Sequence, residues 1–146
     1  MSHLLNKQEI AAALTELLNR TSLPPEQVAR SVNRLFEEFK WEGVPYVEVG
    51  KTAYMVTIYE RGMPMLKKRL KQTDEVLYWL LADIIFTIAH VELMKRHGVD
   101  NVHTYLKYTE AIYAELNADV QKAFQQIGGV YLRWHESGKR QELEQS

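Results

Sequence analysis

The sequence predicts an α+β domain that is mostly helical: two N-terminal helices, a two- or three-stranded antiparallel meander, and three C-terminal helices. Apolar residues recur at helical spacing near both ends of the chain, whereas residues 44–58 are rich in β-branched and aromatic side chains. Because helices and strands are segregated, the pattern does not fit a parallel α/β fold. The 146 residues suit a single domain over residues 1–146, with a polar tail from about residue 136 that we expect to fray.

The first helix is predicted to begin at Asn6, whose side chain can cap it. Glu9 stands three residues later, which is the spacing of a capping box. The apolar stripe of this helix consists of Ile10, Ala13, Leu14, Leu17 and Leu18. The polar residues 19–22 then predict a short break.

The second helix is predicted to start at Pro24 and Pro25, because proline is tolerated in a first helical turn. Its buried stripe is predicted to consist of Val28, Val32, Leu35, Phe36 and Phe39. We expect Gly43 and Pro45 to end it.

The strand-forming residues follow directly. Gly50-Lys51 separates two such runs within Val44–Ile58, which predicts a β-hairpin. A second turn is predicted over Arg61–Pro64. Met65–Lys71 fits a third strand, but its Lys, Arg, Leu and Met residues also tolerate a helical turn, so both interpretations stay open.

The strongest helix is predicted to start at Thr73 or Asp74, either of which can cap it. Between residues 76 and 91 the distinctly polar residues are Asp83, Thr87 and His90. A helix that is apolar nearly all round is typical of a domain core. We do not expect a membrane span, because the run is shorter than about 20 residues and is interrupted by polar side chains.

A cluster of cations followed by Gly98 predicts the end of this helix. A further helix is predicted to start at Asp100 or Asn101. Its packed face is predicted to consist of Val102, Tyr105, Leu106, Ile112 and Leu116. The last helix is predicted to start at Asn117, with Gly128-Gly129 inside it marking a bend or a close helix contact.

Composition excludes several classes of function. The chain has no cysteine, which excludes a disulfide framework, a thiolate metal site and a cysteine nucleophile. The first residues lack a charged region followed by a long apolar stretch, so we expect no signal peptide and a cytoplasmic protein. The net charge of −1 hides an uneven distribution: −2 over residues 1–60, +5 over residues 61–71 and −4 over residues 72–146.

Signatures of catalysis are scarce. The seven glycines are scattered and form no phosphate-binding loop, and His90 and His97 are too far apart for a zinc-protease motif. The stripe of Asp83, Thr87 and His90 fits either an acid–base or metal constellation or a set of polar groups satisfied within the fold, and we favour the second interpretation. We therefore predict no catalytic residue, no metal and no cofactor.

The basic segment 61–71 has two interpretations. Its cations could contact phosphates, which would make the protein a nucleic-acid-binding or regulatory module. Lysines on an edge strand also prevent aggregation between sheets, and the protein as a whole is slightly acidic. We favour the second interpretation and do not expect a nucleic-acid partner.

An acidic and aromatic stretch lies at residues 37–48. Such a surface would suit a protein that blocks a basic active site, and it predicts a contact surface formed by Glu37, Glu38, Trp41, Glu42, Tyr46 and Glu48. The alternative is that Phe39 and Trp41 are core residues and the glutamates form a solvated helix face. We favour the second interpretation from the sequence and keep the contact surface as an open alternative.

Three short motifs carry a resemblance to a known family. They are Glu60-Arg61-Gly62 after a strand, the segment Asp74–Trp79 with Asp83 further along the helix, and Leu116–Asp119. With these motifs the chain resembles, over roughly residues 44–134, a bacterial immunity protein family of polymorphic toxin systems, immunity protein sixty-three. The family-motif residues, with a structural or interface role, are Glu60, Arg61, Gly62, Asp74, Tyr78, Trp79 and Asp83.

The resemblance implies a non-enzymatic antitoxin. Proteins of this kind are made beside a toxic effector that is delivered between neighbouring bacteria, including contact-dependent inhibition systems, and they bind and block its toxin domain. The implied partner is a cognate toxin domain, and no membrane partner is expected. Many toxins of this kind are nucleases, and a nuclease would suit an acidic inhibitor. The alternatives are the nucleic-acid-binding or regulatory module described above and a small hydrolase built on Asp83 and His90. The oligomeric state is left open.

Overall fold

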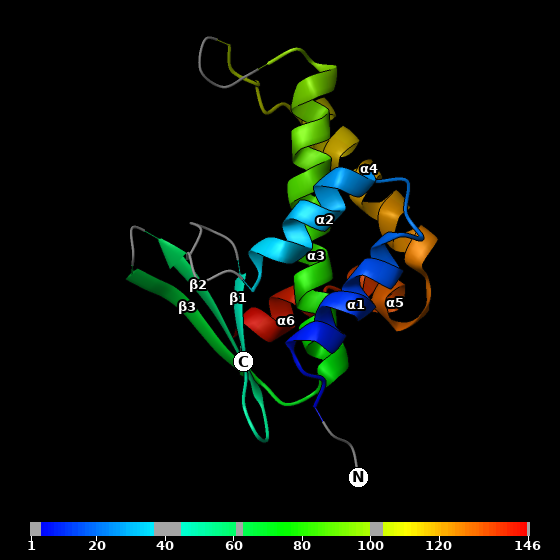
Figure 1. The fold of residues 1–146 in the computed structure, drawn as a ribbon. Coiled ribbons are helices and arrows are strands. Elements are labelled where there is room, and N and C mark those ends of the chain that lie inside the picture. Colours follow the sequence, from blue (N-terminus) through cyan, green and yellow to red (C-terminus); the bar gives the residue numbers. More distant parts are fainter. Residues whose placement is uncertain (1–3, 37–44, 61–62, 100–103, 146) are drawn as a thin grey trace.

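The computed structural model describes residues 4–36, 45–60, 63–99 and 104–145. These residues form the elements α1 (Lys7–Leu18), α2 (Pro25–Arg34), β1 (Pro45–Val49), β2 (Tyr54–Glu60), β3 (Met63–Leu70), α3 (Thr73–Arg96), α4 (Glu110–Ile127), α5 (Gly129–Ser137) and α6 (Lys139–Gln145). The predicted α+β architecture, with strands grouped between two helical parts, is confirmed (Figure 1). The described residues from 73 to 145 form four helices rather than the predicted three.

The capping box of α1 is present as predicted. The Asn6 side chain accepts a hydrogen bond from the Glu9 backbone N–H at 2.8 Å, and the Glu9 carboxylate accepts one from the Asn6 N–H at 2.9 Å. Two backbone donors that the helix itself leaves unpaired are satisfied in this way. The buried side chains of α1 are Ile10, Leu14, Leu17 and Leu18.

Helix α2 starts at Pro25 as predicted but ends earlier than predicted. It stops at Arg34, and the next two residues close a tight turn in which Leu35 and Phe36 donate to carbonyls three residues back. Leu35 is thereby placed in the core, 1% exposed. The prediction that the helix continues to Gly43 is wrong, and Phe39 lies outside the described residues.

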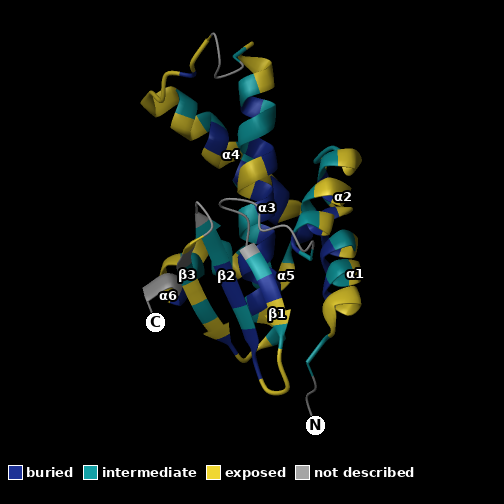
Figure 2. Cartoon of the chain, turned by 60° about the vertical axis from the view of Figure 1, so that its left-hand side comes forward, coloured by how far each residue is buried: buried dark blue, intermediate teal, exposed yellow. Residues whose placement is uncertain are grey.

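The strands form an antiparallel sheet in the order β1-β2-β3, with Val47 opposite Val56 and Val56 opposite Lys68. Figure 2 shows buried residues in β1 and β2 and exposed residues along β3. Of the two interpretations left open for Met65–Lys71, the strand is correct. The prediction of a turn extending to residue 64 is wrong, because Met63 already pairs with Glu60.

Helix α3 is the central element, as predicted. It contacts α1, α2, α4, α5 and two strands, so its mostly apolar surface is covered on several sides (Figure 1). Its length and composition would suffice to cross a membrane, but 61% of its most apolar window is buried inside the fold. That degree of burial is typical of a core helix in a folded domain.

Neither of the predicted capping residues caps α3. The N-cap is Gln72, and it makes no side-chain capping bond. The Thr73 hydroxyl instead lies 3.0 Å from the Tyr54 hydroxyl, and the Asp74 carboxylate accepts a hydrogen bond from the Tyr131 hydroxyl at 3.1 Å. Both side chains are used to join α3 to other elements, which a local pattern does not reveal.

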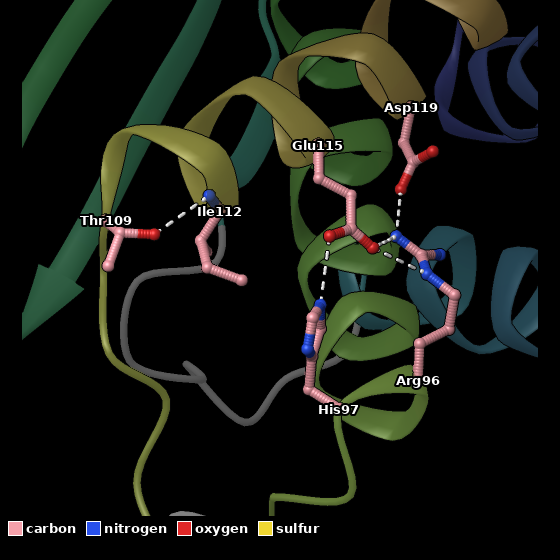
Figure 3. A network of polar contacts seen from close by, with 6 residues as sticks. All are labelled: Arg96, His97, Thr109, Ile112, Glu115 and Asp119. Carbon is pink, nitrogen blue, oxygen red and sulfur yellow. Dashed lines mark hydrogen bonds and ion pairs between the residues drawn. The ribbon is translucent and has the colours of Figure 1, made fainter.

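The boundaries of the later helices differ from the prediction. Residues 104–109 are not helical, and α4 begins after Thr109, whose side chain accepts a hydrogen bond from the Ile112 N–H at 3.3 Å (Figure 3). Asn117 lies within α4 and does not start a helix. Gly128 and Gly129 have φ of +71° and +62°, values that glycine adopts easily, so they separate α4 from α5.

The chain does not fray after His135. Helix α5 continues to Ser137, Gly138 adopts a left-handed conformation with φ of +76°, and α6 follows. Leu143 in α6 is 5% exposed. In Figure 1 α6 (red) lies beside α3, and this placement creates the site described next.

Candidate functional site

The motif segment of α3 faces the C-terminal helix. Lys139, the first residue of α6, forms an ion pair with Glu75 at 3.3 Å and another with Glu142 at 3.3 Å. Its ammonium nitrogen also lies 5.2 Å from the centroid of the Trp134 ring. A single lysine thus connects the start of α3, α5 and α6.

Arg140 touches three residues of the α3 motif. Its guanidinium carbon lies 5.0 Å from the centroid of the Trp79 ring, and one of its nitrogens lies 3.9 Å from the Asp83 carboxylate. Its backbone forms a hydrogen bond with the Tyr78 hydroxyl. Trp79 and Asp83 are four residues apart and therefore lie on the same side of the helix, where one arginine can reach both.

The two motif aromatics are core residues. Trp79 is fully buried and Tyr78 is 1% exposed. The Tyr78 ring lies between Phe124, at 6.0 Å between centroids, and Trp134, at 5.7 Å in an edge-on arrangement. Burial raises the pKa of the Tyr78 hydroxyl. These buried side chains join α3 to α4, α5 and α6.

Asp83 lies beside a cavity of about 500 Å³ between α3, α4, α5 and α6. Its side chain is 21% exposed. Burial raises the pKa of this carboxyl from 3.8 to about 6, and the nearby Arg140 offsets part of that rise. Burial removes most of the water that would stabilise the ionised carboxylate. Arg140 replaces only part of that stabilisation.

His135 forms part of the opposite wall. Its ring stacks on Phe124 with 4.3 Å between centroids and 7° between the ring planes. Burial lowers the pKa of this imidazole. Glu136 lines the same cavity. The cavity thus presents carboxylates, one guanidinium and aromatic walls, a set that suits binding of a polar or cationic group.

The predicted polar stripe does not act as one unit. Asp83 pairs with Arg140, whereas the His90 ring nitrogen lies 2.7 Å from the Tyr108 hydroxyl. Thr87 is exposed. Within the described ranges, no group of three or more His, Asp or Glu side chains is arranged to hold a metal ion.

An exposed row of rings, which we call the aromatic strip, runs from α3 to α4 and was not predicted. It consists of Phe86, His90, Tyr108 and Tyr113. Successive ring centroids lie 6.1, 5.7 and 5.7 Å apart. Phe86, Tyr108 and Tyr113 are 49%, 46% and 51% exposed. The spacing of Phe86 and His90 was the one local signal for it, since both lie on one helix face.

A polar network joins the end of α3 to α4 (Figure 3). Arg96 pairs with Glu115 at 2.9 Å and with Asp119 at 2.6 Å, and His97 lies 2.9 Å from Glu115. The hydrogen bonds from His97 and Arg96 lower the pKa of Glu115. Because these side chains are each about one third or more exposed, water screens the pairs and they contribute little to the stability of the fold.

Two residues of the predicted contact surface lie within the part of the chain that the structure describes. Tyr46 and Glu48 lie on β1 and point to the same face of the sheet, and Lys7 approaches the Tyr46 ring to 5.8 Å. Glu37, Glu38, Trp41 and Glu42 lie outside the described residues, as do Arg61 and Gly62 of the Glu60-Arg61-Gly62 motif, while Glu60 ends β2.

The basic segment is mainly an edge strand. Lys67 and Arg69 are exposed on β3, which lies at the edge of the sheet, and Lys71 is exposed just after it. Charged residues on an edge strand oppose pairing with a second sheet. The edge position that the second interpretation of this segment assumes is therefore present.

Comparison with known proteins identifies the family. A model of the family Immunity protein 63 matches residues 50–144, about two thirds of the chain. The match extends from the hairpin through α6 and includes the α3 motif together with Lys139 and Arg140. A search of curated proteins and a search of solved structures gave no match. The chain therefore belongs to the Immunity protein 63 family.

Proposed function

We propose that this protein is the antitoxin of a toxin–immunity pair, which binds a cognate toxin domain and blocks it by occlusion, without catalysis of its own. The observation that carries the proposal is the family match over residues 50–144. Membership of an immunity protein family suggests an antitoxin role with a protein toxin as the partner. The toxin would be delivered by a neighbouring bacterium, as in contact-dependent growth inhibition, and would be met in the cytoplasm.

The structure supports this proposal through its surface. A stable inhibitory complex buries about 1,200–2,000 Å² and is usually centred on aromatic side chains. The aromatic strip offers three large rings that are each about half exposed, Phe86, Tyr108 and Tyr113. Tyr108 contacts Tyr113 directly, and the His90 ring links Phe86 to Tyr108. Contacts within the strip hold the rings in place before a partner arrives, which reduces the entropy lost on binding.

A nuclease is the toxin class that the charge distribution favours. Residues 72–146 carry a net charge of −4, and the segment 37–48 adds further glutamates. A nuclease has a basic cleft for its substrate, so an acidic inhibitor gains both orientation and association rate from opposite charge. Within this proposal Glu37, Glu38, Trp41, Glu42, Tyr46 and Glu48 form part of the contact surface.

Co-expression tests the proposal. Candidate toxin domains are taken from effector genes adjacent to the gene for this protein and are induced in bacterial cells with or without it. We expect the protein to restore growth and to co-purify with one such domain. Failure to bind and to protect against every adjacent toxin domain would refute the proposal. Binding of nucleic acid that weakens steeply with salt would instead support the alternative module using residues 61–71.

A further inference from the structure

We propose that the cavity beside Asp83 is the anchor pocket of the toxin interface, that it takes a lysine or arginine side chain of the toxin, and that the aromatic strip, which begins at the cavity, forms the adjoining part of that interface. The inference rests on the proposed function and specifies where and how the partner is held. It places the centre of the interface on α3, α4 and α6.

The cavity and the strip form one continuous surface. Phe86 belongs to both, because it lines the cavity and begins the row of rings that runs to Tyr113. Asn117, one helical turn beyond Tyr113 on α4, also lines the cavity. A partner that covers the strip as far as Phe86 therefore reaches the edge of the cavity beside Asp83.

The chemistry of the cavity favours a cation. Asp83 and Glu136 are both carboxylates, whereas Arg140 is the guanidinium among the lining residues. The Arg140 ion pair with Asp83 is long, 3.9 Å, compared with 2.6 Å between Arg96 and Asp119. An ionised carboxylate can accept several hydrogen bonds, so Asp83 has capacity for a second, closer cation.

Arg140 contacts other residues of the α3 motif besides Asp83. Its guanidinium lies over the Trp79 ring, and its backbone bonds the Tyr78 hydroxyl. The family match contains all four of these residues. The arrangement therefore keeps a carboxylate beside an open cavity with a cation near it but not tightly bound to it.

Aromatic walls add to the selectivity for a cation. Phe86 and Phe124 both line the cavity, and a lysine or arginine that enters meets at least one ring face or edge. Attraction between a cation and a ring is strongest where water is excluded. A half-exposed Phe86 at the rim becomes covered when the partner binds, as in the centre of typical interfaces.

The protonation state of Asp83 makes the proposal measurable. Its pKa of about 6 means that a bound cation would favour the ionised form and release a proton. If only the ionised form binds, affinity at pH 5 is about tenfold lower than at pH 7. His135 and Glu136 of α5, Arg140 of α6 and Arg34 of α2 are the other titratable or charged groups near Asp83.

The experiment measures binding of a catalytically inactivated toxin domain, chosen as the one against which the wild-type protein protects cells. Calorimetry at pH 5 and pH 7 compares the wild type with Asp83→Asn and Phe86→Ala. The control is Met63→Ala, because Met63 is a large apolar residue that is 64% exposed on β3. Thermal melts of each variant establish that it is folded.

We expect Asp83→Asn to weaken binding at pH 7 by at least about tenfold and to remove most of the pH dependence. Phe86→Ala should weaken binding by a similar factor, and Met63→Ala should change it less than about twofold. Asparagine keeps the shape of aspartate, so a loss of affinity reports the charge.

Two outcomes would overturn the inference and leave the proposed function intact. One is wild-type affinity in both Asp83→Asn and Phe86→Ala. The other is a wild-type dimer, seen by analytical ultracentrifugation, that Phe86→Ala dissociates, because the strip would then join two copies of this chain. If the wild-type protein itself neither binds nor protects, the proposed function fails and this inference fails with it.

Discussion

Asp83→Asn should change how the stability of the free protein depends on pH. Burial raises the pKa of Asp83 in the folded state from 3.8 to about 6. The folded protein therefore holds this proton more tightly than the unfolded chain does. The contribution of this bound proton to the unfolding free energy is fully present below about pH 4. It is lost as the pH rises through about 6, because the carboxyl then ionises in the folded protein as well.

The shift sets the size of the effect. Each unit of pKa corresponds to about 1.4 kcal/mol, so the rise from 3.8 to about 6 corresponds to about 3 kcal/mol of unfolding free energy. The Asp83 side chain is only 21% exposed, so solvent screens little of this difference. Asparagine cannot ionise and avoids this loss. The advantage of Asp83→Asn over the wild type should therefore grow by about 2.5 kcal/mol between pH 4 and pH 7.5.

Urea unfolding at several pH values, followed by circular dichroism, measures the difference. Comparing the two proteins at each pH cancels the titration of groups that they share, including His135. The control is Glu16→Gln, because the Glu16 side chain is 62% exposed and its pairing with Arg20 contributes little. A gap between wild type and Asp83→Asn that stays constant with pH, or that shrinks as pH rises, would refute the reasoning.

Three further predictions concern the fold and the surface. Asn6→Ala removes the capping box of α1 and should lower the unfolding free energy by about 1 kcal/mol, measured by urea unfolding; an unchanged value would mean that the cap contributes nothing. Deletion of residues 139–146 removes α6, including the buried Leu143 and the cations that lie over Trp79 and Trp134. This deletion should lower the unfolding free energy by about 3 kcal/mol. Thermal melts check this, and an unchanged melting temperature would contradict a structural role for α6. Glu38→Lys combined with Glu42→Lys should weaken toxin binding without altering the melting curve; equal affinity in calorimetry would place the interface away from residues 37–48.

Elements with strong local signals could be predicted from the sequence. The capping box at Asn6 and Glu9, the Gly50-Lys51 hairpin and the apolar helix α3 each depend on residues close together in the chain. The information needed to place them is therefore present in a short window. Their agreement with the structure follows from this locality.

Elements that depend on distant contacts could not be predicted. The stretch beginning at Lys139 is polar and resembles a fraying tail, but Arg140 is ordered on Trp79, which lies far earlier in the chain. Likewise, Thr73 and Asp74 have the chemistry of capping residues, yet distant tyrosines use their side chains. Periodicity does not show which of these long-range partners exist.

The candidate site also depends on contacts between residues that are distant in the sequence. Asp83 was visible as a polar residue in an apolar helix, but the cavity beside it exists only because α4, α5 and α6 close around it. The exposure of Phe86 also depends on which helix faces are covered, so the aromatic strip had no clear sequence signature. Only the family resemblance connected the motif on α3 to a function.

Titration of toxin activity with the purified protein distinguishes occlusion from a catalytic mode of inhibition. The toxin domain is held at a concentration well above the dissociation constant, and its activity is measured after each addition. If the protein acts by occlusion alone, toxin activity falls linearly and reaches zero at equimolar protein, and intact toxin is recovered when the complex is separated. Complete inactivation by a small fraction of an equivalent, or covalently altered toxin after separation, would contradict it.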